Sequence, residues 1–191
     1  MSPLRAALMA LALWLAPSLA QAAPPPPVWV VDHATSQLGF GGVVSGAGFT
    51  GVFRRWDAVI RFSPTDLAHS SVAVTIDMTS AFTNNGDRDA LLPDEDWFWT
   101  SHFPRATFVA NSFTAIGPNR YAAAGVLTIK GAAKPLTLPF TLVITGATAK
   151  MNAQVTVNRL NLGVGQGEWQ ATDTVAAAVT VSANLTATRA K

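Results

Sequence analysis

Hydrophobic and polar residues alternate along most of the chain after residue 28. In the segment 72–79 the four even-numbered residues are apolar, and the four odd-numbered residues are small or polar. Residues 175–186 repeat the alternation over twelve positions. Because successive side chains of a strand point to opposite faces, this pattern indicates strands with one apolar face and one face toward water.

The alternation and the turns between its segments predict about nine strands. The expected bounds are 28–31, 37–44, 49–62, 72–79, 107–116, 121–130, 136–145, 150–158 and 175–186. Gly117, Pro118 and Asn119 form a tight turn, so the strands on either side should pair as a hairpin. A twelve-residue strand is roughly 40 Å long, about twice the usual length. Long antiparallel strands with almost no helix predict an all-β fold that closes into a tall barrel.

One segment, around 87–99, does not fit the strand pattern. Arg88–Leu92 is expected to form one helical turn, and Pro93 suits the start of a second turn that ends near Phe98. The acidic triplet at 94–96 would then lie in a first turn, where carboxylates interact favourably with the helix dipole. Three consecutive carboxylates on a helix point in different directions, so they are not expected to bind a metal. The segment is interpreted as a short helical cap.

The sequence contains no pattern typical of a catalytic or metal site. Its three histidines, His33, His69 and His102, are not at metal-ligand spacing, and no serine lies in a nucleophile elbow. The chain has no cysteine, which excludes disulfides, thiolate metal sites and cysteine nucleophiles. Asp87 and Asp89 flank Arg88, and an ion-paired loop that fixes a lid is favoured over an acid/base pair. We therefore expect no cofactor, no metal and no catalytic residue.

The first 22 residues resemble a secretory signal peptide. Arg5 precedes an apolar core at 6–16 that is too short to span a bilayer, and cleavage is expected before Ala23. A proline-rich spacer at 23–27 follows, and one domain is expected at 28–189. This organisation predicts a periplasmic or secreted protein with no stable membrane insertion.

The charge of the chain after residue 22 is nearly balanced, with 12 basic and 11 acidic side chains. No basic run is present, so no nucleic-acid partner is expected. The segment is instead rich in aromatic and aliphatic side chains. They either fill the barrel or line a cavity for a long apolar ligand, and periodicity alone does not separate these two interpretations.

The order and spacing of several short motifs resemble the YceI-like proteins, a lipocalin-like group of periplasmic polyisoprenoid-binding proteins. The resemblance runs from Trp29 to about Ala187. It is carried by Trp29-Val30-Val31-Asp32, Gly51-Val52-Phe53, Phe62-Ser63-Pro64, Arg88-Asp89, Phe103-Pro104, Ala106-Thr107-Phe108, Gly125–Gly131 with Lys134-Pro135, and Arg159–Gly165.

This resemblance implies an extended antiparallel lipocalin-like β-barrel with an internal apolar channel. It also implies a carrier of an isoprenoid quinone, a prenyl lipid or a similar long-chain lipid, and a homodimer as a common assembly. The residues expected to contact the ligand are Phe40, Phe53, Phe82, Arg88, Asp89, Leu91, Leu92, Trp97, Phe98, Phe108 and Leu127.

Three positions depart from the family pattern. Family members often have histidine where this chain has Thr35, Val44 and Ala90. None of the replacements titrates, so a ligand with a neutral or smaller head group, or one bound by its tail alone, is the resulting hypothesis. Two other functions stay open: a lipid-modifying enzyme on the same barrel, and a ligand-free structural or stress-protective barrel.

Overall fold

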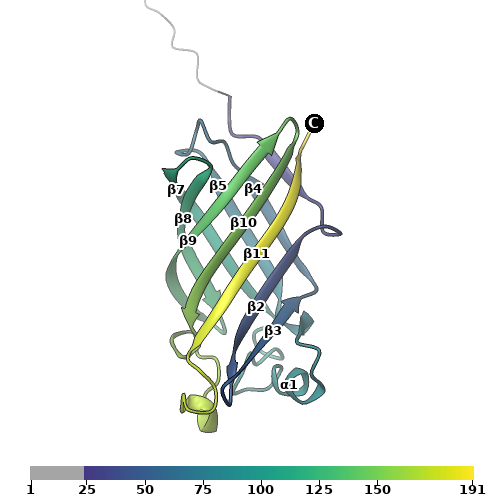
Figure 1. The fold of residues 1–191 in the computed structure, drawn as a ribbon, viewed down its shortest axis with the longest axis vertical. Helices are drawn as coiled ribbons and strands as arrows, with labels where there is room; N and C mark the ends of the chain where they lie inside the picture. The colour runs from purple at the N-terminus through teal and green to yellow at the C-terminus, as the bar shows by residue number, and fades with distance from the viewer. Residues whose placement is uncertain (1–23) are drawn as a thin grey trace, which may run out of the picture.

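The computed structural model describes residues 24–191, which form an antiparallel β-barrel with one short α-helix (Figure 1). The predicted signal peptide and its cleavage site before Ala23 lie outside these residues. The strands are β1 (Val28–Val31), β2 (Gln37–Val44), β3 (Ala47–Phe53), β4 (Trp56–Arg61), β5 (Ser71–Asp77), β6 (Ala81–Phe82), β7 (Arg105–Gly117), β8 (Arg120–Ile129), β9 (Ala132–Thr145), β10 (Thr148–Asn158) and β11 (Ala178–Arg189). The helical elements are η1 (Met78–Ser80), α1 (Gly86–Leu91), η2 (Arg159–Leu162) and η3 (Gly167–Gln170).

Eight strands close the barrel. The ring runs β1-β4-β5-β7-β8-β9-β10-β11, and β1 closes it because it pairs with both β4 and β11. The remaining strands form a side ladder, in which β2 pairs with β11, β3 with β2, and β6 with β3. The predicted fold class, an extended antiparallel barrel of about eight or nine strands with one short helical segment, is confirmed.

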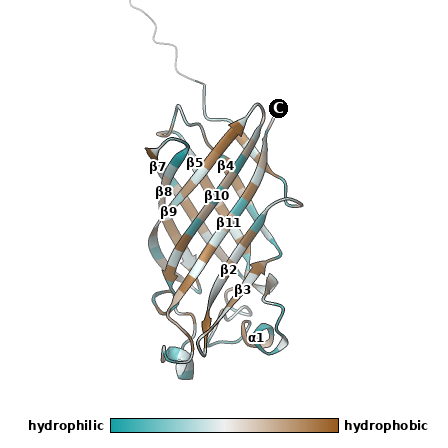
Figure 2. Ribbon diagram, viewed as in Figure 1, coloured by the Kyte–Doolittle hydropathy of each residue, from teal (hydrophilic) through white to brown (hydrophobic). Residues whose placement is uncertain are grey.

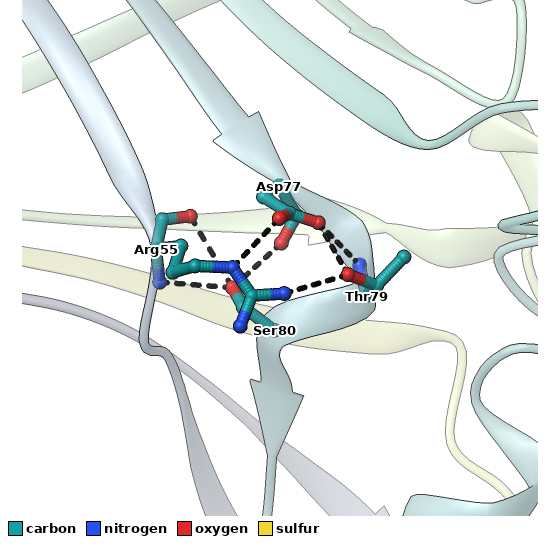
Figure 3. Close-up of polar contacts among 4 residues, drawn as sticks. All are labelled: Arg55, Asp77, Thr79 and Ser80. Carbon is teal, nitrogen blue, oxygen red and sulfur yellow. Dashed lines mark hydrogen bonds and ion pairs between the residues drawn. The ribbon is translucent and has the colours of Figure 1, made fainter.

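Two predicted strands are shorter than expected because the wall bends beside Ser80. The segment 49–62 is divided into β3 and β4, since the amide groups of Arg54 and Arg55 donate to the backbone and hydroxyl oxygens of Ser80 instead of continuing a ladder. The predicted strand 72–79 ends at Asp77, whose carboxylate accepts from the Thr79 amide and so caps η1. Figure 3 shows this polar cluster, in which Arg55 also contacts Asp77 and Thr79.

The bend leaves a gap in the ladder at one end of the barrel. β5 pairs with β7 as far as Asp77 and Arg105, whereas β6 pairs only with β3 among the described residues. The chain between these strands, residues 83–104, contains α1 and lies at this end (Figure 1). We call residues 83–104 the lid. Its second predicted helical turn, after Pro93, is wrong: residues 92–98 form hydrogen-bonded turns.

The alternation along the strands gives the barrel its apolar interior. In β8, Tyr121, Ala123 and Leu127 are buried, whereas Ala124 and Val126 are exposed. Apolar residues recur along the strands in Figure 2. The predicted hairpin of β7 and β8 is confirmed, with positive φ angles at Gly117 and Asn119 in its turn.

Aromatic side chains close the end of the barrel opposite the lid. The Phe62 ring packs against those of Phe113, Tyr121 and Phe140 at centroid distances of 5.3–5.8 Å. The indole of Trp29 donates to the Phe62 carbonyl at 2.9 Å. The predicted spacer contributes here too, because the Pro27 carbonyl accepts from the Phe62 amide. Any opening for a large ligand is therefore expected at the lid.

Candidate functional site

The barrel interior contains a cavity of about 440 Å³. This volume is within the range of roughly 300–1,000 Å³ typical of small-molecule sites. Its wall is formed by inward-facing apolar side chains of the strands, including Leu38, Phe49, Ile76, Leu136, Leu138, Phe140, Met151, Val155, Val179, Val181 and Leu185. The cavity extends from Trp29 and Phe62 at the aromatic end to residues of the lid. The interior is therefore a lined cavity and not a core filled by side chains.

The lid begins with a capped helix. Asn85 is the N-cap of α1, and its side-chain oxygen accepts from the Arg88 amide at 2.9 Å. Asp87 and Asp89 lie in the first turn, where negative charge is favourable. Because α1 is only six residues long, contacts with the barrel, more than helix propensity, hold it in place.

Thr83, the first residue after β6, fixes α1 at the end of this strand through Asp89. The Thr83 amide and hydroxyl donate to the same carboxylate oxygen at 2.8 and 2.6 Å. Desolvation raises the pKa of Asp89, but the hydrogen bonds from Thr83, a backbone hydrogen bond at Asn85 and the charge of Arg88 together outweigh it, so the net pKa is lowered. The predicted Arg88–Asp89 ion pair is wrong: none of the ion pairs within residues 24–191 joins them, and the Arg88 guanidinium instead lies 4.1 Å from the centre of the Phe49 ring.

The lid is joined to the loop that follows β10. We call residues 159–177 the distal loop. The carbonyl of Asp96 accepts from the amides of Gly165 and Gln166 at 2.7 and 2.8 Å. The Lys130 ammonium donates to the carbonyls of Glu95 in the lid and Gly163 in the distal loop. Desolvation lowers the pKa of Lys130. Together these contacts join the lid to the distal loop at the lid end of the cavity.

Arg159 organises the distal loop from within. Its side chain is 3% exposed, and its guanidinium donates five hydrogen bonds to backbone carbonyls. The acceptors are Val164, Gly165, Trp169, Val175 and Ala176. Every N–H of the guanidinium has a partner, so Arg159 acts on the loop backbone. Desolvation lowers the pKa of Arg159.

Nine of the eleven predicted contact residues lie on the cavity wall. They are Phe40, Phe53, Arg88, Leu91, Leu92, Trp97, Phe98, Phe108 and Leu127. The other two, Phe82 and Asp89, are not among the lining residues. Phe82 is paired with Val52, next to inward-facing Phe53, so it faces outward, and Arg54 lies 3.5 Å from its ring centre. Whether the nine contact a ligand stays a prediction.

Of the three positions where family members often carry histidine, only Val44 lines the cavity. The Thr35 hydroxyl donates to Asp32 in an exposed turn, and Ala90 lies on the exposed side of α1. The hypothesis about the head group therefore rests on Val44 alone and loses the support of the other two positions.

Polar groups are few on the cavity wall. They come from Asn85, Asp87, Arg88, Arg159 and Ser182, four of them in the lid or the distal loop. Within residues 24–191, no three histidine or acidic side chains come close enough to hold a metal ion. No helix in the same range is long and apolar enough to cross a membrane. The site is suited to binding an apolar chain whose polar end lies near the lid.

Sequence reasoning missed part of the wall. Phe49, Trp169 and Arg159 belong to the cavity, but none was predicted as a site residue. Alternation along β3 places Phe49 on the same face as Phe53, so that signal was available. Nothing in the local sequence distinguishes a buried Arg159 from an exposed one, because its partners are backbone carbonyls of the distal loop.

Comparison with known proteins identifies relatives over most of the barrel. Residues 29–187 match the family model of the YceI-like domain. Protein YceI of Escherichia coli O157:H7 is 36% identical over 93 residues, which cover 49% of this chain, and the chain spans about half (48%) of the length of that curated relative. The crystal structure of BcnA from Burkholderia cenocepacia is 33% identical, with a TM-score of 0.80, over 83% of this chain and 99% of BcnA.

A third likeness concerns the fold alone. It is to a structure from Saccharophagus degradans described as a polyisoprenoid binding domain implicated in plant cell wall breakdown. The two are 12% identical, with a TM-score of 0.69, over 86% of this chain and 99% of that one.

Proposed function

The chain belongs to the YceI-like family, and on this premise we propose that it holds a long-chain isoprenoid, such as a quinone or prenyl lipid, or a similar acyl lipid inside its barrel. The observation that carries the proposal is the cavity of about 440 Å³ with an almost wholly apolar wall. Each buried methylene of a lipid tail contributes about 0.8 kcal/mol to transfer from water. A long tail would therefore bind without any polar chemistry.

The two ends of the barrel differ in character, and this difference supports one orientation of the lipid. The aromatic cluster around Phe62 closes one end, whereas most polar lining groups belong to the lid and the distal loop. The tail would therefore point toward Phe62 and the polar end toward the lid. The fold shared with the Saccharophagus degradans domain, described as polyisoprenoid binding, is in keeping with such a cargo.

The proposed location and assembly follow from the sequence. A signal peptide cut before Ala23 would export the protein to the periplasm or the medium, where a carrier would shield a lipid from water. No nucleic-acid partner and no stable membrane insertion are proposed. A homodimer is the assembly implied by the family resemblance.

Organic extraction of the purified protein, followed by mass spectrometry, tests the proposal. We expect a long-chain lipid at close to one molecule per barrel. Adding an isoprenoid quinone to delipidated protein should raise the Tm, because a ligand that binds only the native state stabilises it. An empty extract together with an unchanged Tm would overturn the proposal and favour a ligand-free structural barrel.

The enzyme alternative would use Asp87 and Asp89 as an acid/base pair, and the geometry does not bring both to the cavity. Asp87 lines the cavity, but Asp89 does not, and the Oδ1 atom of Asp89 accepts two hydrogen bonds from Thr83. Turnover of a lipid that is abolished in Asp89→Asn, with lipid binding retained, would reverse this assessment.

A further inference from the structure

We infer that the cavity sets the length of the lipid tail that it encloses, and that this tail has about 16 main-chain carbons, as in a tail of four isoprene units or a palmityl-type chain. This inference rests on the proposed function and goes beyond it by naming the length class of the lipid. It follows from the length of the cavity wall and from the aromatic rings that end it.

The strands β10 and β11 give the length of the cavity, because they run obliquely from one end of the barrel to the other (Figure 1). Their inward-facing residues line the cavity from the pair Ala149 and Ala187 at the aromatic end to the pair Val157 and Val179 at the lid end. The two pairs are eight residues apart along each strand, which is roughly 27 Å. A strand tilt of about 40° reduces this to about 20 Å along the barrel axis.

The width of the cavity keeps a tail extended. An eight-stranded barrel is just wide enough for its own side chains or for one small ligand. Large inward side chains, such as Phe40, Leu138 and Phe140, take up part of that width along the wall. A tail inside the barrel therefore lies along the axis and does not fold back on itself, so its length is compared directly with the length of the wall.

Four aromatic rings form a floor at the end opposite the lid. Phe62 is 4% exposed, and its ring packs against those of Phe113, Tyr121 and Phe140, which come from β7, β8 and β9. The floor is more than one ring deep, because Tyr121 stacks on Phe140 at 5.5 Å but does not line the cavity. The Phe62 carbonyl accepts from the Trp29 indole at 2.9 Å, which fixes the position of this residue. A hydrocarbon tail therefore ends at the floor.

The geometry of a carbon chain converts this length into a chemical class. Carbon–carbon bonds of about 1.5 Å at tetrahedral angles advance about 1.25 Å per carbon in an extended chain. A wall of about 20 Å therefore encloses about 16 main-chain carbons. An isoprene unit adds four of them, so the fourth unit completes the fit. Each further unit would lie in water beyond the lid and would forfeit the transfer free energy of its carbons.

Competition among prenols of different length tests the inference. Delipidated protein is incubated with phosphatidylcholine vesicles that carry equal amounts of geraniol, farnesol, geranylgeraniol, geranylfarnesol and solanesol, which have two, three, four, five and nine isoprene units. The protein is then separated from the vesicles, and its organic extract is quantified by mass spectrometry. Because the vesicles already keep every tail out of water, geranylgeraniol should be the most enriched, and solanesol should be depleted at least about tenfold relative to it. A second mixture of linear alcohols, from decanol to tetracosanol, should peak near hexadecanol.

Two variants should move the peak in opposite directions. Phe62→Ala removes a ring from the floor and should shift the optimum toward geranylfarnesol. Ala149→Phe adds a ring beside the floor, where Ala149 lines the cavity, and should shift the optimum toward farnesol. Ala124→Phe makes the same substitution at an exposed position of β8 and should keep the wild-type profile.

The outcomes separate this inference from the proposed function. A peak more than one unit away from geranylgeraniol, or a recovered amount that does not fall toward solanesol, would overturn the length limit and leave the carrier intact. A peak that stays in place in folded Phe62→Ala and Ala149→Phe would do the same. If neither variant folds, the wild-type profile decides alone. Failure of wild-type protein to take up any member of either mixture would overturn the carrier function itself.

Discussion

The guanidinium of Arg55 donates to the carboxylate of Asp77 at 2.8 Å, across the point where the barrel wall bends (Figure 3). The same carboxylate accepts from the Thr79 amide and hydroxyl at 2.9 and 2.6 Å. Asp77 therefore joins the end of β5 to the break between β3 and β4. The bend creates the gap that the lid covers, so this pair contributes to the shape of the cavity mouth.

The pH dependence of stability should reveal this contribution. The hydrogen bond from Thr79, followed by the one from Arg55, lowers the pKa of Asp77 in the folded state despite desolvation. A lowered folded pKa means that the stabilisation is complete above the unfolded pKa of about 3.9 and is lost as the pH falls through the folded value. Asp77→Asn should cost about 1 kcal/mol in free energy of unfolding at pH 7.

Urea denaturation at several pH values provides the measurement. The difference between wild type and Asp77→Asn should be constant from pH 7 to about 5 and should shrink below about pH 4. Asp57→Asn is a suitable control, because the Asp57 side chain is 82% exposed and its one ion pair within residues 24–191 is at 3.9 Å, with His33. A difference for Asp77 that persists at the lowest pH would contradict the assignment.

Thr83→Val should loosen the lid. The substitution removes the hydroxyl that donates to Asp89 at 2.6 Å and keeps the shape of the side chain. We expect a loss of about 1–2 kcal/mol in free energy of unfolding, because the hydrogen bond is to a charged group. Amide hydrogen exchange should also accelerate at Asp89 and Leu92, whose amides are bonded within α1. Thr137→Val, at an exposed position of β9, should change neither quantity by much.

The strands were predictable because their signal is local. A two-residue period depends only on which side chains face the core, and it placed β1 and β2 at their observed bounds. The breaks were not predictable in the same way. β3 stops before Arg54 because Ser80, more than twenty residues away, takes the backbone hydrogen bonds. A long-range partner of this kind leaves no periodic signal at the break.

The site residues that lie on strands were predictable from the alternation of side chains, and those in the lid were less so. Phe40, Phe53, Phe108 and Leu127 line the cavity because alternation fixes the face of a strand residue. Asp89 was misplaced because the orientation of α1 depends on its contact with Thr83, which sequence spacing does not specify. The lid remains the part of the molecule for which tertiary contacts decide the geometry.

Arg159→Lys should destabilise the distal loop strongly. Lysine keeps the charge but has three donors in place of five and lacks the planar fork, so at least two carbonyls lose their partner. We expect a loss of about 3 kcal/mol in free energy of unfolding, measured by urea denaturation. Arg120→Lys, on the exposed start of β8, is the matched control and should stay within about 0.5 kcal/mol of wild type. Equal behaviour of the two variants would exclude a structural role for Arg159.

Gly165→Ala tests the same packing from the other partner. Gly165 has a φ of +71°, and an added β-carbon would lie 2.0 Å from Arg159 Nη1. The loop must move to accommodate it, so this variant should lose stability as well. Gly46→Ala is a control for backbone strain alone, because Gly46 has a φ of +79° but an added β-carbon meets nothing within 4 Å. A smaller effect at Gly165 than at Gly46 would contradict the proposed contact.

Ala183→Phe should block the cavity without removing the barrel. Ala183 lies on the cavity wall in β11, directly opposite Leu38 and Ala153 on the neighbouring strands, so a phenyl ring there would occupy the middle of the channel. Ala124→Phe makes the same change on the outer face of β8, where Ala124 is exposed. Organic extracts of Ala183→Phe should contain less than about a tenth of the lipid found with wild type, since several methylenes would lose their place and each is worth about 0.8 kcal/mol. Ala124→Phe should retain the wild-type amount.

Circular dichroism spectra and cooperative thermal unfolding must match for the two variants, so that a difference in lipid content reports the cavity and not misfolding. Equal lipid content in both would place the lipid outside the barrel and contradict the proposed carrier function.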